Sequence, residues 1–162
     1  MKMDTKQMKV LLERYGRLKI RIENSQNKIR RIRAYSFEEY IEEKTYRSPL
    51  GERRLQGAKP SNPTETLGLY GRGQFERERD AQLRAEQFRL REMQALLWQM
   101  DSLIGKLNGQ EQVFIQRRYA EGERVEDFYK ELGVSRATAF RRIEDGIARL
   151  AELYNEQYET AA

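Results

Sequence analysis

The stretch that decides the expected fold is NGQEQVFIQRRYAEGERVEDFYKELGVSRATAFRRIEDGIARLAELY, residues 108–154. Its apolar residues recur every three or four positions in three blocks, which is typical of amphipathic helices. Asn108 and Glu111 have the spacing of a capping box at the start of the first helix. The second helix is predicted over 125–132 and the third from Arg136 to about Tyr154. The stretch therefore predicts a small module of three helices.

A three-residue corner separates the second and third of these helices. Gly133 suits the left-handed conformation that ends a helix, and Ser135 suits the N-cap of the next one. Val134, between them, is expected to fill the corner. Two helices joined by so short a turn are typical of a helix-turn-helix, whose second helix enters the major groove of DNA with its N-terminal residues against the bases.

The outer face of the third helix supplies the candidate site. The residues expected to contact double-stranded DNA are Lys130, Ser135, Arg136, Ala137, Thr138, Phe140, Arg141 and Arg142. Arginine can donate two hydrogen bonds to a guanine edge, which places Arg136, Thr138 and Arg141 nearest the bases in this hypothesis. Lys130, Ser135 and Arg142 are then candidates for phosphate contacts. The alternative is an ordinary three-helix bundle with a solvated arginine face.

The N-terminal region carries a heptad pattern typical of a long helix. Its apolar seam consists of Met8, Leu11, Tyr15, Leu18, Ile22, Ile29 and Ile32, with Ser25 as the single polar interruption. Residues 1–33 hold eleven Lys and Arg against three Asp and Glu, whereas residues 108–162 hold eight against eleven. The basic faces of the first helix are either a solvated surface or a surface for DNA phosphates.

Between these regions the pattern changes twice. Ser36 and Glu39 have capping-box spacing, which predicts a short helix through about Thr45. Residues 47–73 contain all three prolines and predict an irregular linker. A second heptad helix is predicted from about Gln74 to Lys106, with Glu86 at a core position. Trp98 beside its seam is expected to pack. The two seams need burial, either by antiparallel folding back within one chain or by pairing in a homo-oligomer.

Composition gives the fold class and excludes several kinds of site. Of the 162 residues, 38% are hydrophobic and 35% charged, and the chain holds no cysteine and no histidine. Disulfides, thiolate metal sites and the commonest general base are thereby excluded. No cofactor or metal is expected and the protein is not expected to be an enzyme, although a site made of carboxylates alone stays open. No apolar run is long enough for a membrane span, so a cytoplasmic protein is expected.

The expected fold is all-α, with two long heptad-patterned helices and a C-terminal helix-turn-helix module. The expected segments are a basic heptad helix with a short helix over 1–46, a linker over 47–73, a second long helix over 74–107 and the DNA-binding module over 108–162.

The module also resembles a known family. Its sequence VFIQRRYAEGERVEDFYKELGVSRATAFRRIEDGIARL is similar to region four of bacterial sigma factors and to phage regulators of the ArpU and RinA type. The resemblance lies in an "RY-x-x-G" motif followed by an "LG-x-S-x-x-T-x-aromatic-R" corner, formed here by Arg118, Tyr119, Gly122, Leu132, Gly133, Ser135, Thr138, Phe140 and Arg141. It implies a phage or prophage regulator of late genes for packaging, morphogenesis or lysis, with RNA polymerase as a possible partner.

The expected function is therefore sequence-specific DNA binding in transcription regulation. The main alternative is a small terminase-like subunit for DNA packaging, which also joins a helix-turn-helix to oligomerisation helices. A ring of many subunits would favour packaging, and a monomer or dimer would favour regulation. The DNA-binding end of a recombinase fits less well, because no catalytic domain precedes the module.

Overall fold

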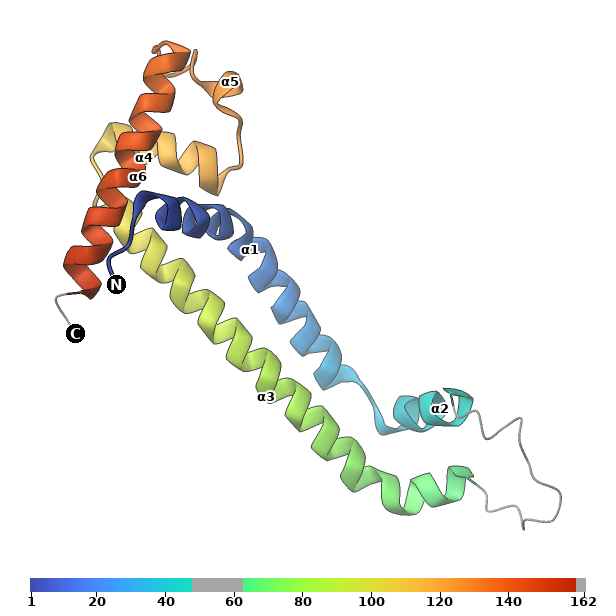
Figure 1. Cartoon of the computed structure of the whole chain (residues 1–162). Coiled ribbons are helices and arrows are strands. Elements are labelled where there is room, and N and C mark those ends of the chain that lie inside the picture. The colour runs from blue at the N-terminus through green and yellow to red at the C-terminus, as the bar shows by residue number, and fades with distance from the viewer. Residues whose placement is uncertain (48–62, 160–162) are drawn as a thin grey trace. The chain divides into compact units, whose positions relative to one another are not determined.

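The computed structural model describes the backbone of residues 1–47 and 63–159 and the side chains of residues 1–45 and 71–159. Over these ranges the protein is helical and contains no strand, which confirms the predicted all-α class. In chain order the elements are α1 (Thr5–Ala34), α2 (Phe37–Arg47), α3 (Pro63–Gly105), α4 (Gly109–Ile115), the π-helical segment η2 (Gln116–Ala120), α5 (Val125–Phe128) and α6 (Arg136–Tyr158) (Figure 1).

The second long helix begins earlier than the sequence predicts. Its first residue is Pro63, so residues 63–73 are helical although the expected linker included them. Proline is tolerated at the first helical position because the backbone N–H that it lacks has no partner within the helix there. Residues 48–62, the rest of the expected linker, lie outside the described residues.

The chain divides into two compact units, each of which contains part of α1 and part of α3. The terminal unit comprises Met1–Glu23 and Arg91–Ala162, and the middle unit comprises Asn24–Leu90. These units differ from the four segments expected from the sequence, because both long helices continue from one unit into the other.

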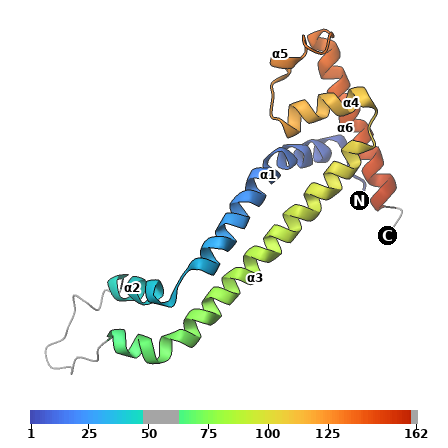
Figure 2. The ribbon, with the colours of Figure 1, turned by 180° about the vertical axis from the view of Figure 1, so that it is seen from behind.

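In the terminal unit, the first part of α1 lies antiparallel to the last part of α3, and α4, η2, α5 and α6 complete the core (Figures 1 and 2). The largest side chains with almost no exposed surface are Met8, Leu12, Leu18, Met100, Leu103, Ile104, Ile115, Phe128 and Leu150. The antiparallel pairing within one chain is the first of the two alternatives for burying the seams. Most heptad residues of this unit are therefore buried by the same chain, and Leu11, Met93 and Leu97 are half-buried.

The seam of α1 in this unit differs from the expected one at one position. Leu12 is fully buried, whereas Leu11, which the heptad pattern assigned to the seam, is only half-buried. Burial extends to the side of α1 that carries Leu12 because the helix-turn-helix module packs there in addition to α3. Trp98 corrects a second expectation, since 70% of its surface is exposed. Met100 takes the core position, and Trp98, two residues earlier, is carried to another side of α3.

Polar contacts hold the two ends of the described chain together in the terminal unit. The backbone N–H of Met3 donates to Oδ1 of Asn155 at 2.7 Å, and Nδ2 of Asn155 donates to the Met3 carbonyl at 3.0 Å. Tyr15 on α1 donates its hydroxyl proton to Oδ1 of Asp101 on α3 at 2.6 Å. Burial, together with Asp101, raises the pKa of Tyr15 above its ordinary value. The two hydrogen bonds between Met3 and Asn155 fix the chain before α1 against the C-terminal part of α6, and the Tyr15 hydrogen bond joins α1 to α3.

In the middle unit, the two polar interruptions of the heptads meet each other. Ser25 on α1 donates its hydroxyl proton to Oε1 of Glu86 on α3 at 2.8 Å, and both residues are buried. Nζ of Lys28 lies 3.1 Å from Oε2 of the same carboxylate. The hydrogen bond from Ser25, followed by that from Lys28, lowers the pKa of Glu86. The pair fixes the register of α1 against α3, because a shifted helix would leave a carboxylate in the core without a partner.

Aromatic side chains close the other end of the middle unit. Phe75 of α3 lies 5.2 Å from the ring of Tyr40, 5.7 Å from that of Phe37 and 5.9 Å from that of Tyr35. The predicted short helix is present as α2, and the Ser36 hydroxyl accepts a hydrogen bond from the Glu39 N–H at 3.1 Å.

Replacing Ser25 with alanine is expected to destabilise the protein by about 1–3 kcal/mol, because a buried carboxylate oxygen loses its donor. The loss depends on pH in a defined direction. Glu86 has a folded-state pKa below its ordinary value of 4.5, so its contribution is present above that value and disappears as the pH falls through the folded pKa. Urea unfolding followed by circular dichroism should therefore show a large difference between variant and parent at neutral pH and a smaller one in acid.

Asn24→Ala is the matched control for this prediction, because Asn24 is the exposed neighbour of Ser25 on α1. It is expected to leave the stability almost unchanged at both pH values. Equal losses for Ser25→Ala and Asn24→Ala would contradict the pairing of Ser25 with Glu86.

Candidate nucleic-acid interface

The helix-turn-helix module begins at the cap that the sequence predicts. The Asn108 side chain accepts a hydrogen bond from the Glu111 N–H at 2.8 Å at the start of α4. Phe114 and Ile115 of α4 are buried and pack against α6. At this crossing a Cβ on Gly146 of α6 would lie 3.0 Å from a side-chain carbon of Ile115. The absence of a side chain at Gly146 thus allows the two helices to pack closely.

Directly after α4 the helix continues as the π-helical segment η2, and η2 contacts α1. The backbone carbonyl of Tyr119 faces Gly16 so closely that a Cβ at Gly16 would lie 2.2 Å from the carbonyl oxygen. Only glycine allows this approach. Tyr119 is itself buried, and burial raises the pKa of its hydroxyl. The module is therefore mounted on α1 by a backbone contact at a residue that the heptad analysis did not single out.

The first helix of the corner is shorter than predicted. The expected helix covered 125–132, but α5 ends at Phe128 and the next residues form turns. Val125 and Phe128 are buried, and Leu132 packs against the core from the turn. The apolar spacing continues past the end of the helix, which explains why the sequence pattern overestimates its length.

The corner itself has the predicted geometry. Gly133 has φ 69°, in the left-handed region, and Ser135 is the N-cap of α6. The Thr138 N–H donates to the Ser135 hydroxyl at 3.2 Å, and that hydroxyl donates in turn to the Thr138 hydroxyl at 2.8 Å. Both hydroxyl groups thus make contacts that build the start of α6.

Replacing Gly133 with valine is expected to destabilise the module by about 1–2 kcal/mol, the usual cost of the left-handed conformation for a residue with a Cβ. The added Cβ would meet nothing within 4 Å, so the backbone conformation alone causes the loss. Gly133→Asn should lose less, because asparagine tolerates this conformation. Gly105→Val is the control at a glycine without positive φ. Thermal melts in which Gly133→Val and Gly105→Val behave alike would be inconsistent with this explanation.

The structure places most of the eight candidate residues on the surface of the module. Six are exposed, namely Lys130, Ser135, Arg136, Ala137, Phe140 and Arg141, and two are half-buried, namely Thr138 and Arg142. Lys130 lies in the turn after α5, and the others lie at the cap or in the first two turns of α6. Arg142 points back to α4, where it donates to the Gln110 side chain and lies over the Phe114 ring.

The arginines on this face differ in what they contact. Arg136 donates to Oε1 of Glu126 on α5 at 2.9 Å, and its guanidinium lies 5.2 Å from the centre of the Phe140 ring. The hydrogen bond from Arg136 lowers the pKa of Glu126. Arg141 makes no hydrogen bond or ion pair with any residue whose side chain the structure describes. Glu126 thus brings an acidic side chain to this face from a position ten residues earlier in the chain.

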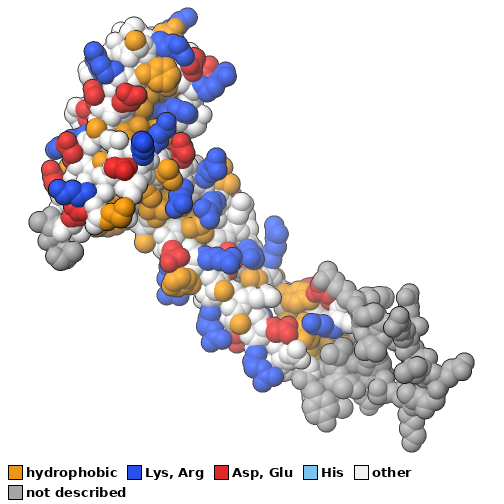
Figure 3. Space-filling model, viewed as in Figure 1, with side chains coloured by type: hydrophobic (Ala, Val, Ile, Leu, Met, Phe, Trp, Pro, Cys, Tyr) orange, Lys and Arg blue, Asp and Glu red, His pale blue; other side chains and the backbone are white. Residues whose placement is uncertain are grey.

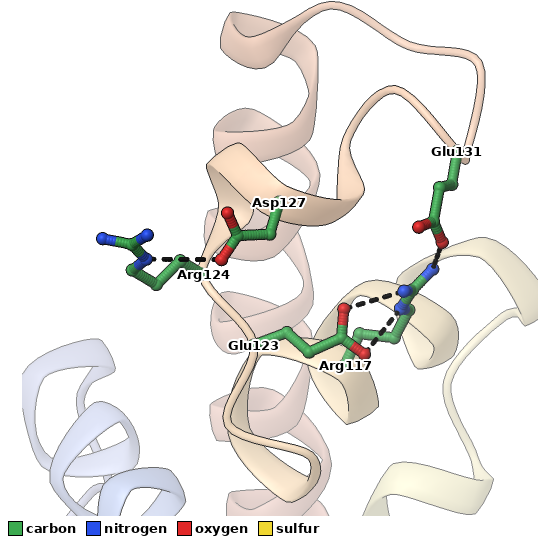
Figure 4. A network of polar contacts seen from close by, with 5 residues as sticks. All are labelled: Arg117, Glu123, Arg124, Asp127 and Glu131. Carbon is green, nitrogen blue, oxygen red and sulfur yellow. Dashed lines mark hydrogen bonds and ion pairs between the residues drawn. The ribbon is translucent and has the colours of Figure 1, made fainter.

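Arg117 of η2 donates hydrogen bonds to the segments before and after α5 (Figure 4). Its guanidinium donates to both carboxylate oxygens of Glu123, at 2.7 and 3.2 Å, and to Oε2 of Glu131 at 2.7 Å. These hydrogen bonds raise the pKa of Arg117 and lower that of Glu123. Because Glu131 lies two residues before Gly133, Arg117 helps to position the corner. No pattern within one helix would have identified this residue.

The surface of the module carries both signs of charge. Figure 3 shows basic and acidic side chains mixed over the part formed by α4, α5 and α6. Arg124 pairs with Asp127 at 3.3 Å, and Arg149 pairs with Glu152 at 3.0 Å. Four of the eight Lys and Arg residues of the module pair with carboxylates, namely Arg117, Arg124, Arg136 and Arg149. The exposed start of α6, with Arg136, Phe140 and Arg141, is the candidate recognition surface.

Comparison with protein-family models, with curated proteins and with solved structures gives no match to this chain. In the described part of the chain no cluster of three or more acidic side chains is arranged to hold a metal ion. None of the described helices combines the length and the apolar character that a membrane crossing requires.

Proposed function

We propose that this protein is a sequence-specific DNA-binding transcription regulator whose α6 reads the major groove. The observation that carries the proposal is the start of α6. A left-handed Gly133 and the Ser135 cap present Arg136, Ala137, Phe140 and Arg141 at the exposed N-terminal end of a helix whose opposite side is buried. A recognition helix contacts base edges with these same first turns.

Arg141 is the residue best suited to read a base. Its guanidinium has no partner among the described side chains, so it reaches a guanine edge without first giving up an ion pair. Arg136 must release Glu126 before it contacts DNA. Loss of the ion pair with Glu126 is offset only at DNA sites where Arg136 makes two hydrogen bonds to a base. At other sites the carboxylate of Glu126 repels nearby phosphates. This pair thus supports selective rather than indiscriminate binding.

The resemblance to phage regulators of the ArpU and RinA type supports the finer proposal of a late-gene regulator, with RNA polymerase as a second proposed partner. In the packaging alternative, α1 and α3 would hold many copies together. Within each unit, however, these helices bury much of their seams against the same chain, which favours regulation. Light scattering distinguishes the two, because packaging requires a ring of many subunits.

The experiment that tests the proposal is selection of bound sequences from a pool of random duplex DNA with the full chain. Enrichment of one motif is the expected result. Repeated rounds that enrich no motif would overturn the proposal of sequence-specific binding.

A further inference from the structure

A row of three arginines on α1 has no assigned role. Arg14, Arg17 and Arg21 are spaced by three and four residues, so they lie along one side of the helix in the terminal unit. All three side chains are exposed. None of the three makes a hydrogen bond or ion pair with a side chain that the structure describes.

The same is true of every lysine in this part of α1 and its N-terminal extension. The seven Lys and Arg residues between positions 1 and 23 form no ion pair with the described acids. Elsewhere the pattern is different. Arg117, Arg124, Arg136 and Arg149 of the module all pair with carboxylates. On α3, Arg72 pairs with Glu76, and Arg89 with Glu86. Seven cations without an ion pair thus lie on or just before α1. The others that the structure describes without an ion pair in this unit, namely Lys106, Arg118, Lys130, Arg141 and Arg142, are spread over several elements.

Repulsion among these three arginines destabilises α1 when no anion is bound. Like charges three or four residues apart on a helix repel one another and destabilise it by a few tenths of a kcal/mol per pair. An ordinary solvated helix face reduces this repulsion by interleaving acids, as α3 does. A polyanion bound along α1 would remove the repulsion and release condensed counterions from its own surface.

The row also lies away from the side of α1 that packs against η2. Gly16 marks the side of α1 that contacts η2. Arg14 and Arg21 lie two and five residues from Gly16, which places them on the other side of the helix. Phosphates bound at Arg14 and Arg21 would therefore lie against a side of α1 other than the one that packs on η2.

We propose that Arg14, Arg17 and Arg21 form a second, sequence-independent surface that binds the phosphate backbone of duplex DNA. This inference rests on the proposed function in one respect, which is that the bound polyanion is DNA. It explains how a chain whose module carries more acids than bases holds DNA, because the non-specific electrostatic contacts lie on α1.

The test is the salt dependence of binding to a random-sequence duplex, measured by fluorescence anisotropy with the full chain. In the Arg14→Gln, Arg17→Gln, Arg21→Gln variant, the slope of log K against log salt is expected to fall by about 0.9 for each lost phosphate contact, or about 2.7 for three. Over a fourfold rise in salt, the parent should then lose about 40-fold more affinity than the variant. The triple lysine variant keeps the charges and should keep most of the slope.

A matched control removes the same number of charges elsewhere. Arg30, Arg77 and Arg84 are exposed residues of the middle unit, and their joint change to glutamine should leave the slope almost unchanged. An unchanged slope in the α1 variant, an equal fall in the control, or a parent that does not bind random duplex at all would each overturn the inference. Circular dichroism melts should show that both variants are folded.

The two proposals fail in different ways. If selection enriches no motif but the α1 variant loses its salt dependence, the α6 proposal fails and this surface stands. If a motif is enriched and the α1 variant keeps its slope, the α6 proposal stands and this surface fails.

Discussion

Replacing Arg141 with alanine is expected to weaken binding to the selected DNA site by about 1–3 kcal/mol, which is roughly 5- to 150-fold. The structure gives the reason. Arg141 is exposed on the second turn of α6 and makes no hydrogen bond or ion pair with the described side chains. The Arg141→Ala variant is therefore expected to keep the fold of the parent. A gel-shift titration against the selected site measures the loss, and a melt confirms that stability is retained.

Arg149→Ala is the matched control for this prediction. Arg149 is an exposed arginine of the same helix, two turns further along, and it pairs with Glu152 at 3.0 Å. The two variants have the same net charge, so a general electrostatic effect would weaken binding equally in both. The prediction is a large loss for Arg141→Ala and little change for Arg149→Ala. Equal losses would argue against a base contact by Arg141.

Replacing Gly16 with alanine is expected to destabilise the terminal unit, although alanine is the better helix former. The new Cβ would lie 2.2 Å from the Tyr119 carbonyl oxygen, a backbone atom that moves only if η2 moves. Overpacking of this kind typically costs about 1–3 kcal/mol. For a chain of this size each kcal/mol lowers the melting temperature by about 2–4 °C. The module should also dock less firmly on α1, with faster hydrogen exchange in η2.

The same substitution at Gly73 should have the opposite sign. Gly73 lies inside α3, and a Cβ there would meet nothing within 4 Å. Only helix propensity then changes, and Gly73→Ala should stabilise the protein by about 0.8–1 kcal/mol. If Gly16→Ala raised the melting temperature as Gly73→Ala does, the close approach of α1 to η2 would be refuted.

Features that depend on a few neighbouring residues were predictable from the sequence. The caps at Ser36, Asn108 and Ser135 are present, and Gly133 has the positive φ that the corner requires. Each of these depends on hydrogen bonds or backbone angles within four residues. The all-α class followed from composition and from apolar spacing, which is also a local property. The predicted length of α5 was wrong because Leu132 keeps the helical spacing but packs against the core from a turn.

Features that depend on distant residues were not predictable. The sequence showed one polar interruption in each heptad but not that Ser25 would meet Glu86, because this depends on how the two helices align. Gly16 stands out only once η2 lies against it. Most of the predicted site residues are exposed as expected, yet the contact of Arg136 with Glu126 joins residues ten positions apart. Such pairs follow from packing rather than from spacing.

The most direct test of base reading by α6 is to repeat the selection from random duplex DNA with Arg141→Ala and compare its motif with that of the parent. A side chain that contacts one base pair contributes preference at that position alone. The predicted result is a motif that loses its preference at one or two adjacent positions and keeps the rest. An identical motif from parent and variant would contradict the assignment of α6 as the helix that reads DNA through Arg141.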